Sequence, residues 1–109
     1  MKVGTGKHKY AVVPDWGVGK GGKNFGGIIT GIGIDRSDHV YLSRRNPPAI
    51  LVYDRQGTFL SAWETETLAN PHGVFADSDS RVWVTDSENH TVQCFTPEGK
   101  ISQILGTPR

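Results

Sequence analysis

Residues 31–35 (GIGID) return 42 positions later as residues 73–77 (GVFAD), and they open two similar segments. The likeness continues without a gap over residues 31–64 and 73–106. A fixed period near 40 residues with strand-like content is typical of a repeat architecture. The internal repeat therefore decides the fold class before any single motif does.

Each copy alternates short runs of β-branched and aromatic residues with turn signals, such as residues 54–57 (DRQG). The pattern predicts four antiparallel strands per copy. They lie at residues 30–34, 39–43, 49–53 and 58–63 in the first copy, and at 73–76, 81–85, 91–95 and 100–105 in the second. Four strands at a period of about 40 to 45 residues predict an all-β fold of β-propeller blades. A helical repeat is disfavoured, because no long window keeps the helical spacing of apolar residues.

The repeat divides the chain into five segments. They are an N-terminal strand and glycine-rich loop (1–29), blade A (30–64), an inter-blade loop (65–72), blade B (73–106) and a truncated continuation (107–109). Propellers close with about four to eight blades, and two blades leave open faces and unpaired edges. We therefore expect a fragment of a longer propeller, with assembly from several copies as the alternative. Residues 10–13 (YAVV) could supply the outer strand of a ring-closing blade.

Composition gives weak guidance on function. The formal net charge of +1 gives no electrostatic reason to expect nucleic acid or an anionic membrane as partner. No apolar run reaches the roughly 18 residues of a membrane-spanning helix, and residues 1–4 do not open a signal peptide. The sequence predicts a soluble protein and leaves the compartment open. The lone Cys94 excludes an internal disulfide and is expected to be a buried strand residue.

Residues 17–23 (GVGKGGK) satisfy the G-x-x-x-x-G-K spacing of phosphate-binding loops. Asn24 stands where a serine or threonine must reach Mg²⁺, and neither a preceding hydrophobic strand nor a following helix is apparent. The run is therefore interpreted as a glycine-rich loop rather than as a nucleotide site.

Strand direction sorts the loops onto two ends of the blades. The short turns at 35–38, 54–57, 77–80 and 96–99 share one end, the bottom, and the longer segments at 14–29, 44–48, 64–72 and 86–90 share the top. First strands line the channel of a propeller. His72, immediately before such a strand, is expected nearest the axis at the top, with Arg44 or Arg45 overhanging the same mouth.

Residues 86–95 (DSENHTVQCF) resemble the NHL repeat of six-bladed propellers. A larger pattern is similar to the peptidyl-α-hydroxyglycine α-amidating lyases and their bacterial relatives. It consists of residues 70–74 (NPHGV), 82–86 (VWVTD) and 90–92 (HTV), together with Arg45 and residues 50–54 (ILVYD). The likeness covers about residues 8 to 109.

The resemblance implies a zinc ion held by three histidines and cleavage of peptidyl-α-hydroxyglycine to a peptide amide and glyoxylate. By resemblance, His72 is the first zinc ligand, Arg45 pairs with the substrate carboxylate, and the backbone carbonyls of Ile32 and Val74 face a structural calcium. The residue types suit this chemistry. Zinc lowers the pKa of a bound hydroxyl, and arginine holds a carboxylate with two hydrogen bonds.

The family's other two histidine ligands and its catalytic tyrosine belong to later blades, which this chain does not reach. The remaining histidines are not expected to replace them. His39 follows a bottom turn, His90 lies in an outer loop where a structural hydrogen bond is expected, and His8 lies near the N-terminus. The chain alone is therefore expected to bind zinc weakly and to be inactive without further blades.

Two other functions stay open. One is a non-catalytic NHL propeller that binds a protein or peptide on its top face. The other is a calcium-dependent lactonase-like propeller, which requires carboxylate and asparagine ligands at the channel. The run Pro71-His72-Gly73, with no acidic residue beside it, favours the lyase over the lactonase. Fold likeness alone does not separate the lyase from the binding module.

Several of these residues also have a purely structural interpretation. His72 can hydrogen-bond a neighbouring blade, and Arg45 can be a solvated loop charge. Packing roles are expected for Trp16, Trp63 and Trp83. Asp35 and Asp77 are expected to cap the turns that follow them through side-chain to backbone bonds.

Overall fold

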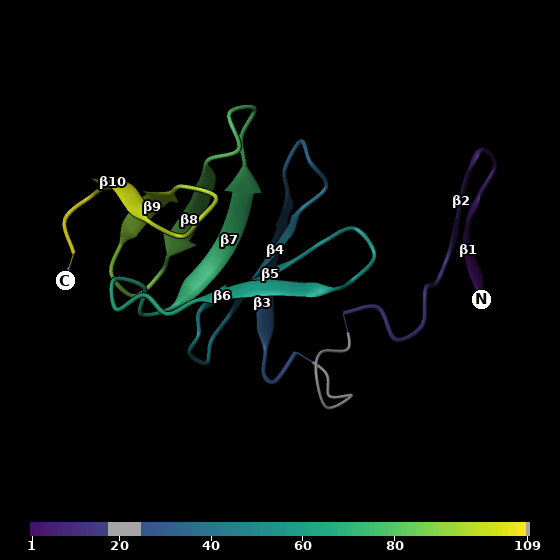
Figure 1. Cartoon of the computed structure of the whole chain (residues 1–109), viewed down its shortest axis with the longest axis horizontal. Helices are drawn as coiled ribbons and strands as arrows, with labels where there is room; N and C mark the ends of the chain where they lie inside the picture. The colour runs from purple at the N-terminus through teal and green to yellow at the C-terminus, as the bar shows by residue number, and fades with distance from the viewer. Residues whose placement is uncertain (18–24, 109) are drawn as a thin grey trace.

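The structure is a computed structural model, and it describes residues 1–17 and 25–108. Every regular element in these ranges is a β-strand (Figure 1). The strands are β1 (Lys2–Thr5), β2 (His8–Ala11), β3 (Ile29–Ile34), β4 (Val40–Arg44), β5 (Ile50–Tyr53), β6 (Phe59–Trp63), β7 (Pro71–Ala76), β8 (Val82–Asp86), β9 (Thr91–Phe95) and β10 (Ile101–Leu105). Apart from Gly17, the run at 17–23 lies outside the described residues.

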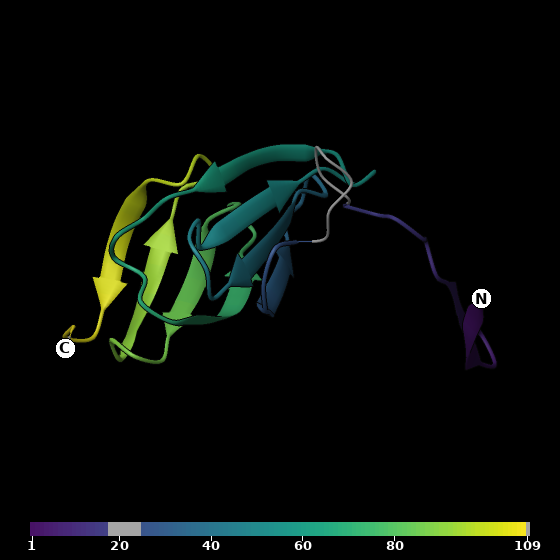
Figure 2. The ribbon, with the colours of Figure 1, turned by 90° about the horizontal axis from the view of Figure 1, so that it is seen from below.

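The strands form two four-stranded antiparallel sheets, β3-β4-β5-β6 and β7-β8-β9-β10. Each strand pairs with its neighbour in the sequence. Blade A and blade B lie side by side in Figures 1 and 2, and the first strands β3 and β7 contact one another. The prediction of an all-β propeller fold with two four-stranded blades is confirmed.

The predicted strand boundaries are accurate to one or two residues. The largest difference is β7, which begins at Pro71 and therefore includes His72 instead of following it. Pro71 pairs with Asp86, and the register then shifts before Val74 pairs with Val84. Proline is tolerated at the first position of a strand, where it need not donate to the ladder.

Side chains alternate between the two faces of each blade. In β4, Tyr41 belongs to the core between the blades, whereas Val40 and Leu42 belong to a second cluster on the opposite face of blade A. All three residues are buried. Because both faces of the strand are covered, it shows a continuous apolar run rather than an apolar and polar alternation.

The core between the blades is built from large side chains of both sheets. Its members include Tyr41, Ile50, Val52, Trp63, Val82, Val84 and Phe95. The inner strands approach so closely that a Cβ atom on Gly31 would lie 2.5 Å from the His72 carbonyl oxygen. Glycine at this position therefore allows the blades to meet at the axis.

Aspartates cap equivalent bottom turns in both blades. Asp35 Oδ1 accepts hydrogen bonds from the backbone N–H groups of Ser37 and His39, at 2.8 and 3.0 Å. Asp77 Oδ1 accepts 2.9 Å bonds from the N–H groups of Asp79 and Arg81. The capping role predicted for the two aspartates is confirmed.

The N-terminal strands β1 and β2 form a separate two-stranded hairpin in which Tyr10 pairs with Val3. Figure 2 shows this hairpin standing apart from the blades. In this structure, residues 10–13 are thus not an outer strand of a blade. The strands of a ring-closing blade with which they would pair are not among the described residues, so their role in ring closure stays a prediction.

Candidate functional site

A cleft opens at the top of the molecule between the two blades. Its volume is about 480 Å³, and its walls include Arg45, Pro47, Glu64, Thr65, Glu66 and Pro71. We call it the interblade cleft. It combines one guanidinium, two carboxylates and apolar proline surfaces. Such a cleft can hold a small ligand or a peptide segment through both charge and apolar contact.

Two adjacent arginines at this mouth have opposite environments. The Arg44 guanidinium donates to the backbone carbonyls of Phe25 (2.6 Å), Gly26 (3.4 Å), Pro47 (3.1 Å) and Pro48 (2.8 Å). Arg44 therefore fastens two loops and has little capacity left for a ligand. The Arg45 side chain is exposed, and among the described residues its guanidinium makes no hydrogen bond or ion pair. Of the two arginines predicted at this mouth, only Arg45 has a guanidinium available to a ligand in the cleft.

The inter-blade loop that forms one wall is tied to both blades. Leu68 is buried in the core between them. The Gln93 amide donates to the Thr67 carbonyl at 2.8 Å. Ser87 N donates to the Asn70 carbonyl at 3.1 Å. The wall of the cleft is thus part of the folded structure.

Asp86 is the central anchor of this loop. Its buried carboxylate accepts hydrogen bonds from the backbone N–H groups of Ala69, Asn70, Glu88 and Asn89, at 2.7 to 3.1 Å. Burial raises the pKa of the carboxyl, but these N–H donors outweigh it and bring the pKa below its ordinary value. The anchoring role of Asp86 was not predicted from the sequence. The available signal was an aspartate directly before the turn at 87–90.

His72 lies at the start of β7 with an exposed side chain, and its backbone is held firmly. The Ser43 hydroxyl donates to the His72 carbonyl at 3.4 Å, and the Thr30 hydroxyl donates to the Pro71 carbonyl at 2.8 Å. These bonds connect β3 and β4 of blade A to the top end of β7 in blade B. The imidazole itself is therefore free to contact a ligand.

The described residues contain no group of three or more histidine, cysteine, aspartate or glutamate side chains able to hold a metal ion. His72 thus belongs to no such three-residue group within the described part of the chain. Ile32 and Val74 occupy equivalent register positions, opposite Leu42 and Val84. The Val74 carbonyl faces blade A, since a Cβ on Gly33 would lie 3.3 Å from its oxygen. Zinc and calcium binding stay predictions.

The other histidines lie away from the interblade cleft. His39 Nδ1 is 3.1 Å from Asp35 Oδ2 at the bottom turn, and His8 lies in the N-terminal hairpin. His90 has a backbone φ of 58° and an exposed side chain. The structural hydrogen bond expected of its imidazole is not found among the described residues. His90 instead adopts the left-handed backbone conformation in the turn before β9.

The predicted packing roles are confirmed. Cys94 is buried in β9. Trp63 packs against Tyr41 and Phe95, with ring centroids 5.7 and 5.4 Å apart. Trp83 Nε1 donates a 3.0 Å hydrogen bond to Asp77 Oδ2. These residues build the blades and do not line the interblade cleft.

Comparison with known proteins agrees with this architecture. The family model of the NHL repeat matches residues 68–95, so the chain contains an NHL repeat. NHL repeat-containing protein 3 of Homo sapiens is 42% identical over 78 residues, which is 63% of this chain and 22% of that protein. The Mus musculus protein of the same name is 35% identical over 104 residues, which is 86% of this chain and 30% of that protein.

The chain thus spans less than a third of the length of these curated relatives. Their names describe the repeat and do not mention an amidating lyase. In the part of the chain that the structure describes, no helix has the length and apolar character needed to cross a membrane.

Proposed function

We propose that this NHL-type propeller chain binds a peptide with a free carboxylate at its top face, with Arg45 as the recognising residue. The observation that carries the proposal is the contrast between the two neighbouring arginines. Arg44 spends its guanidinium on four backbone carbonyls, whereas Arg45 projects into the interblade cleft without a partner among the described residues. A guanidinium in this state can donate two parallel hydrogen bonds, one to each oxygen of a carboxylate.

The cleft suits a peptide in size and chemistry. Its volume of about 480 Å³ lies within the range of roughly 300 to 1,000 Å³ typical of ligand sites. Pro47 provides apolar surface beside Arg45. The carboxylates of Glu64 and Glu66 at the rim repel a second acidic group and can pair with a basic group elsewhere on the peptide. We therefore expect a preference for a peptide whose apolar side chain lies next to its carboxylate.

A zinc-dependent amidating lyase is the second candidate, and one observation favours it. His72 and Arg45 both lie exposed at the top ends of the blades, where that activity requires a zinc ligand and a carboxylate-binding arginine. A catalytic zinc site needs about three protein ligands, and the described part of this chain would contribute one, His72. The lyase proposal therefore depends on histidines from further blades.

The first proposal is tested with N-acetyl-phenylalanylglycine and its C-terminal amide, titrated calorimetrically into the 109-residue chain. The acid is expected to bind more tightly than the amide, and Arg45→Gln is expected to remove this difference. Loss of a charge-assisted hydrogen bond should weaken binding about tenfold or more. Lys100→Gln, which removes an exposed cation at the bottom, is the matched control. Equal binding of acid and amide would refute the proposal.

The same titrations separate the two candidates. A binding module should bind the peptide equally well with EDTA present and with His72→Ala. The lyase candidate instead predicts weak zinc binding that His72→Ala abolishes and that Arg45→Gln leaves unchanged. Zinc binding that is indifferent to His72→Ala would remove the support for the second candidate.

A further inference from the structure

The two glutamates of the interblade cleft have unpaired carboxylates. Glu64 and Glu66 are exposed, and among the described residues neither side chain makes a hydrogen bond or an ion pair. The ion pairs within the described part of the chain join other residues. Arg45, which lines the same cleft, has no partner there either. One cation and two anions therefore line one cleft without neutralising one another.

The sheet of blade A keeps these charges apart. Ser43 of β4 pairs with Ile50 of β5, and Ile50 pairs with Trp63 of β6, so the three residues form one row near the top of the blade. Arg45 lies two residues beyond this row, and Glu64 lies one residue beyond it. Neighbouring strands are about 4.8 Å apart, so the backbones of β4 and β6 are separated by about 10 Å. The cleft thus presents a positive end and a negative end rather than an internal ion pair.

The backbone that carries each charge is held in place. Arg45 N donates to the Ile28 carbonyl at 3.2 Å. On the side of the glutamates, the Thr65 and Thr67 hydroxyls share a hydrogen bond of 2.8 Å. The Thr67 carbonyl also accepts the bond from the Gln93 amide. A ligand therefore has to order only the charged side chains, which lowers the entropy cost of binding.

The charges of the cleft favour a ligand that carries both signs. Its one guanidinium and two carboxylates give a formal charge of −1, whereas the whole chain has a formal charge of +1. A peptide with a carboxylate alone would bring a third negative charge beside two unpaired ones. A peptide that also carries a cation can pair with both ends of the cleft.

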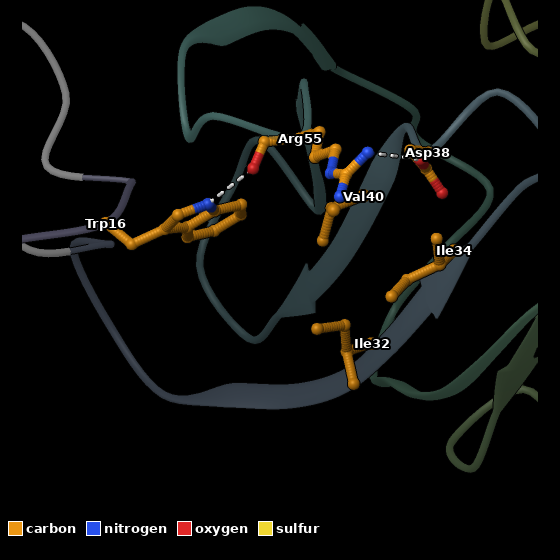
Figure 3. Close-up of a pocket in the computed structure, with 6 residues that line it drawn as sticks. All are labelled: Trp16, Ile32, Ile34, Asp38, Val40 and Arg55. Carbon is orange, nitrogen blue, oxygen red and sulfur yellow. Dashed lines mark hydrogen bonds and ion pairs between the residues drawn. The ribbon is translucent and has the colours of Figure 1, made fainter. Parts of the chain in front are cut away.

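A second pocket of the chain shows the opposite arrangement of charges. It has a volume of about 500 Å³ and lies on the face of blade A that is turned away from blade B. Figure 3 shows its two charged residues, Arg55 and Asp38, joined by an ion pair of 3.7 Å near the apolar Ile32 and Ile34. These charges are satisfied within the chain. In a closed propeller a neighbouring blade covers this face, so we assign no ligand to it.

We propose that Glu64 and Glu66 recognise a cationic group of the same peptide whose carboxylate binds Arg45, and that this group lies about 10 Å from the carboxylate. Because the position of the cation is measured from the carboxylate at Arg45, this proposal rests on the proposed function. An extended chain spans at most about 3.6 Å per residue, so a tripeptide covers the distance. The cation is either a basic side chain on the third residue from the C-terminus or the amino terminus of a tripeptide.

The test uses four peptides that end in phenylalanylglycine, titrated calorimetrically into the 109-residue chain at low salt. They begin with N-acetyl-lysine, with norleucine that has a free amino group, with N-acetyl-norleucine and with N-acetyl-glutamate. Norleucine keeps the apolar stem of lysine without its charge. The lysyl peptide or the free-amino peptide should bind about three- to tenfold more tightly than the N-acetyl-norleucyl peptide, and the glutamyl peptide should bind more weakly. These differences should nearly disappear in about 1 M NaCl.

The source of the cation follows from which peptide gains affinity. A gain with the lysyl peptide places the cation on a side chain, and a gain with the free-amino peptide places it at the amino terminus. Glu64→Gln combined with Glu66→Gln should remove the gain. Glu88→Gln is the matched control and should keep it, because this exposed carboxylate also lies in a top loop but does not line the cleft.

The outcomes separate cation recognition from carboxylate recognition. If the peptide acids bind more tightly than their amides but the N-acetyl-norleucyl peptide binds as tightly as both cationic peptides, cation recognition is wrong and the proposed function stands. A gain that persists in the double variant of Glu64 and Glu66 also refutes it. If acids and amides bind equally while the gain depends on the two glutamates, the proposed function is wrong and cation recognition stands. If none of the four peptides binds, both are wrong.

Discussion

The Tyr41 hydroxyl donates a 2.8 Å hydrogen bond to Asp35 Oδ2. The same relationship recurs one repeat later with different chemistry, where the indole N–H of Trp83 donates to Asp77 Oδ2 at 3.0 Å. In each blade one carboxylate oxygen caps the turn and the other is held by an aromatic donor on the second strand. This pair of contacts couples the bottom turn to the blade interior.

Tyr41→Phe should lower the free energy of unfolding by about 1 to 2 kcal/mol, because the buried Asp35 oxygen loses its hydroxyl donor. The measurement is urea unfolding followed by tryptophan emission. Tyr10→Phe is the matched control, since its ring is 62% exposed in the N-terminal hairpin. A Tyr41→Phe variant as stable as the control would show that the hydroxyl bond contributes nothing net.

Asp86→Asn should be more damaging, by about 2 to 3 kcal/mol, because it weakens several bonds to one buried charge and turns an amide N–H₂ toward N–H donors. Hydrogen exchange at the Ala69 and Asn70 amides should accelerate together. Asp79→Asn, at an exposed turn position, should change stability by less than about 0.5 kcal/mol. Equal effects of the two substitutions would contradict the anchoring role of Asp86.

Acid should destabilise the fold in a defined window. Hydrogen bonds hold the pKa of Asp35 and Asp86 below the ordinary value against the effect of burial, and the Trp83 indole is the leading cause that lowers the pKa of Asp77 to about 2. Because the unfolded chain binds these protons first, the stabilisation is complete above the unfolded pKa of about 4 and is lost as pH falls through the folded values.

The urea midpoint should therefore be flat from about pH 7 to 5 and fall between about pH 4 and 2. Asp77→Asn should make the fall of the urea midpoint at low pH, which we call the acid limb, less steep. The reason is that the substitution removes one of the groups whose pKa is lowered in the folded chain. An acid limb as steep in the variant as in the wild-type chain would show that Asp77 does not take part in the transition.

The adjacent arginines should separate stability from binding. Arg44→Gln should cost about 1.5 to 3 kcal/mol, because it leaves loop carbonyls without their charged donor. Arg45→Gln should change stability by no more than about 0.5 kcal/mol, as is usual for exposed side chains. Thermal unfolding checks both values. A strong loss of stability with Arg45→Gln would assign that residue a structural role.

Much of the fold follows from local features that can be read directly. The 42-residue repeat, the turn aspartates and the strand runs can be read from the sequence directly, so the predicted strands agree with the observed ones to within one or two residues. The start of β7 was less predictable. The pairing of Pro71 with Asp86 is decided by the opposite strand and by a shift in register.

The candidate site could be predicted only in outline. Strand direction placed Arg44 and Arg45 at the same mouth, and only the family resemblance selected Arg45. The physical difference between the two could not be predicted, because it depends on the carbonyls of Phe25 and Gly26, about 20 residues before Arg44. The anchoring role of Asp86 was not predicted for the same reason, since two of its backbone donors lie on the preceding loop.

By itself, the sequence determined the repeat, the number of strands in each blade, the capped turns and the end of the blades at which the longer loops gather, because each depends on short-range backbone geometry and the alternation of side chains. Only the tertiary structure decided that the Arg44 guanidinium is bound by loop carbonyls while that of Arg45 stays available. It also decided that Trp16 packs on Tyr53 of blade A as Trp63 packs on Phe95 of blade B, and that Ile32 and Ile34 remain exposed. These properties are set by contacts between distant segments. Close packing and hydrogen bonding across the blades give such contacts their energy, and no local pattern encodes them.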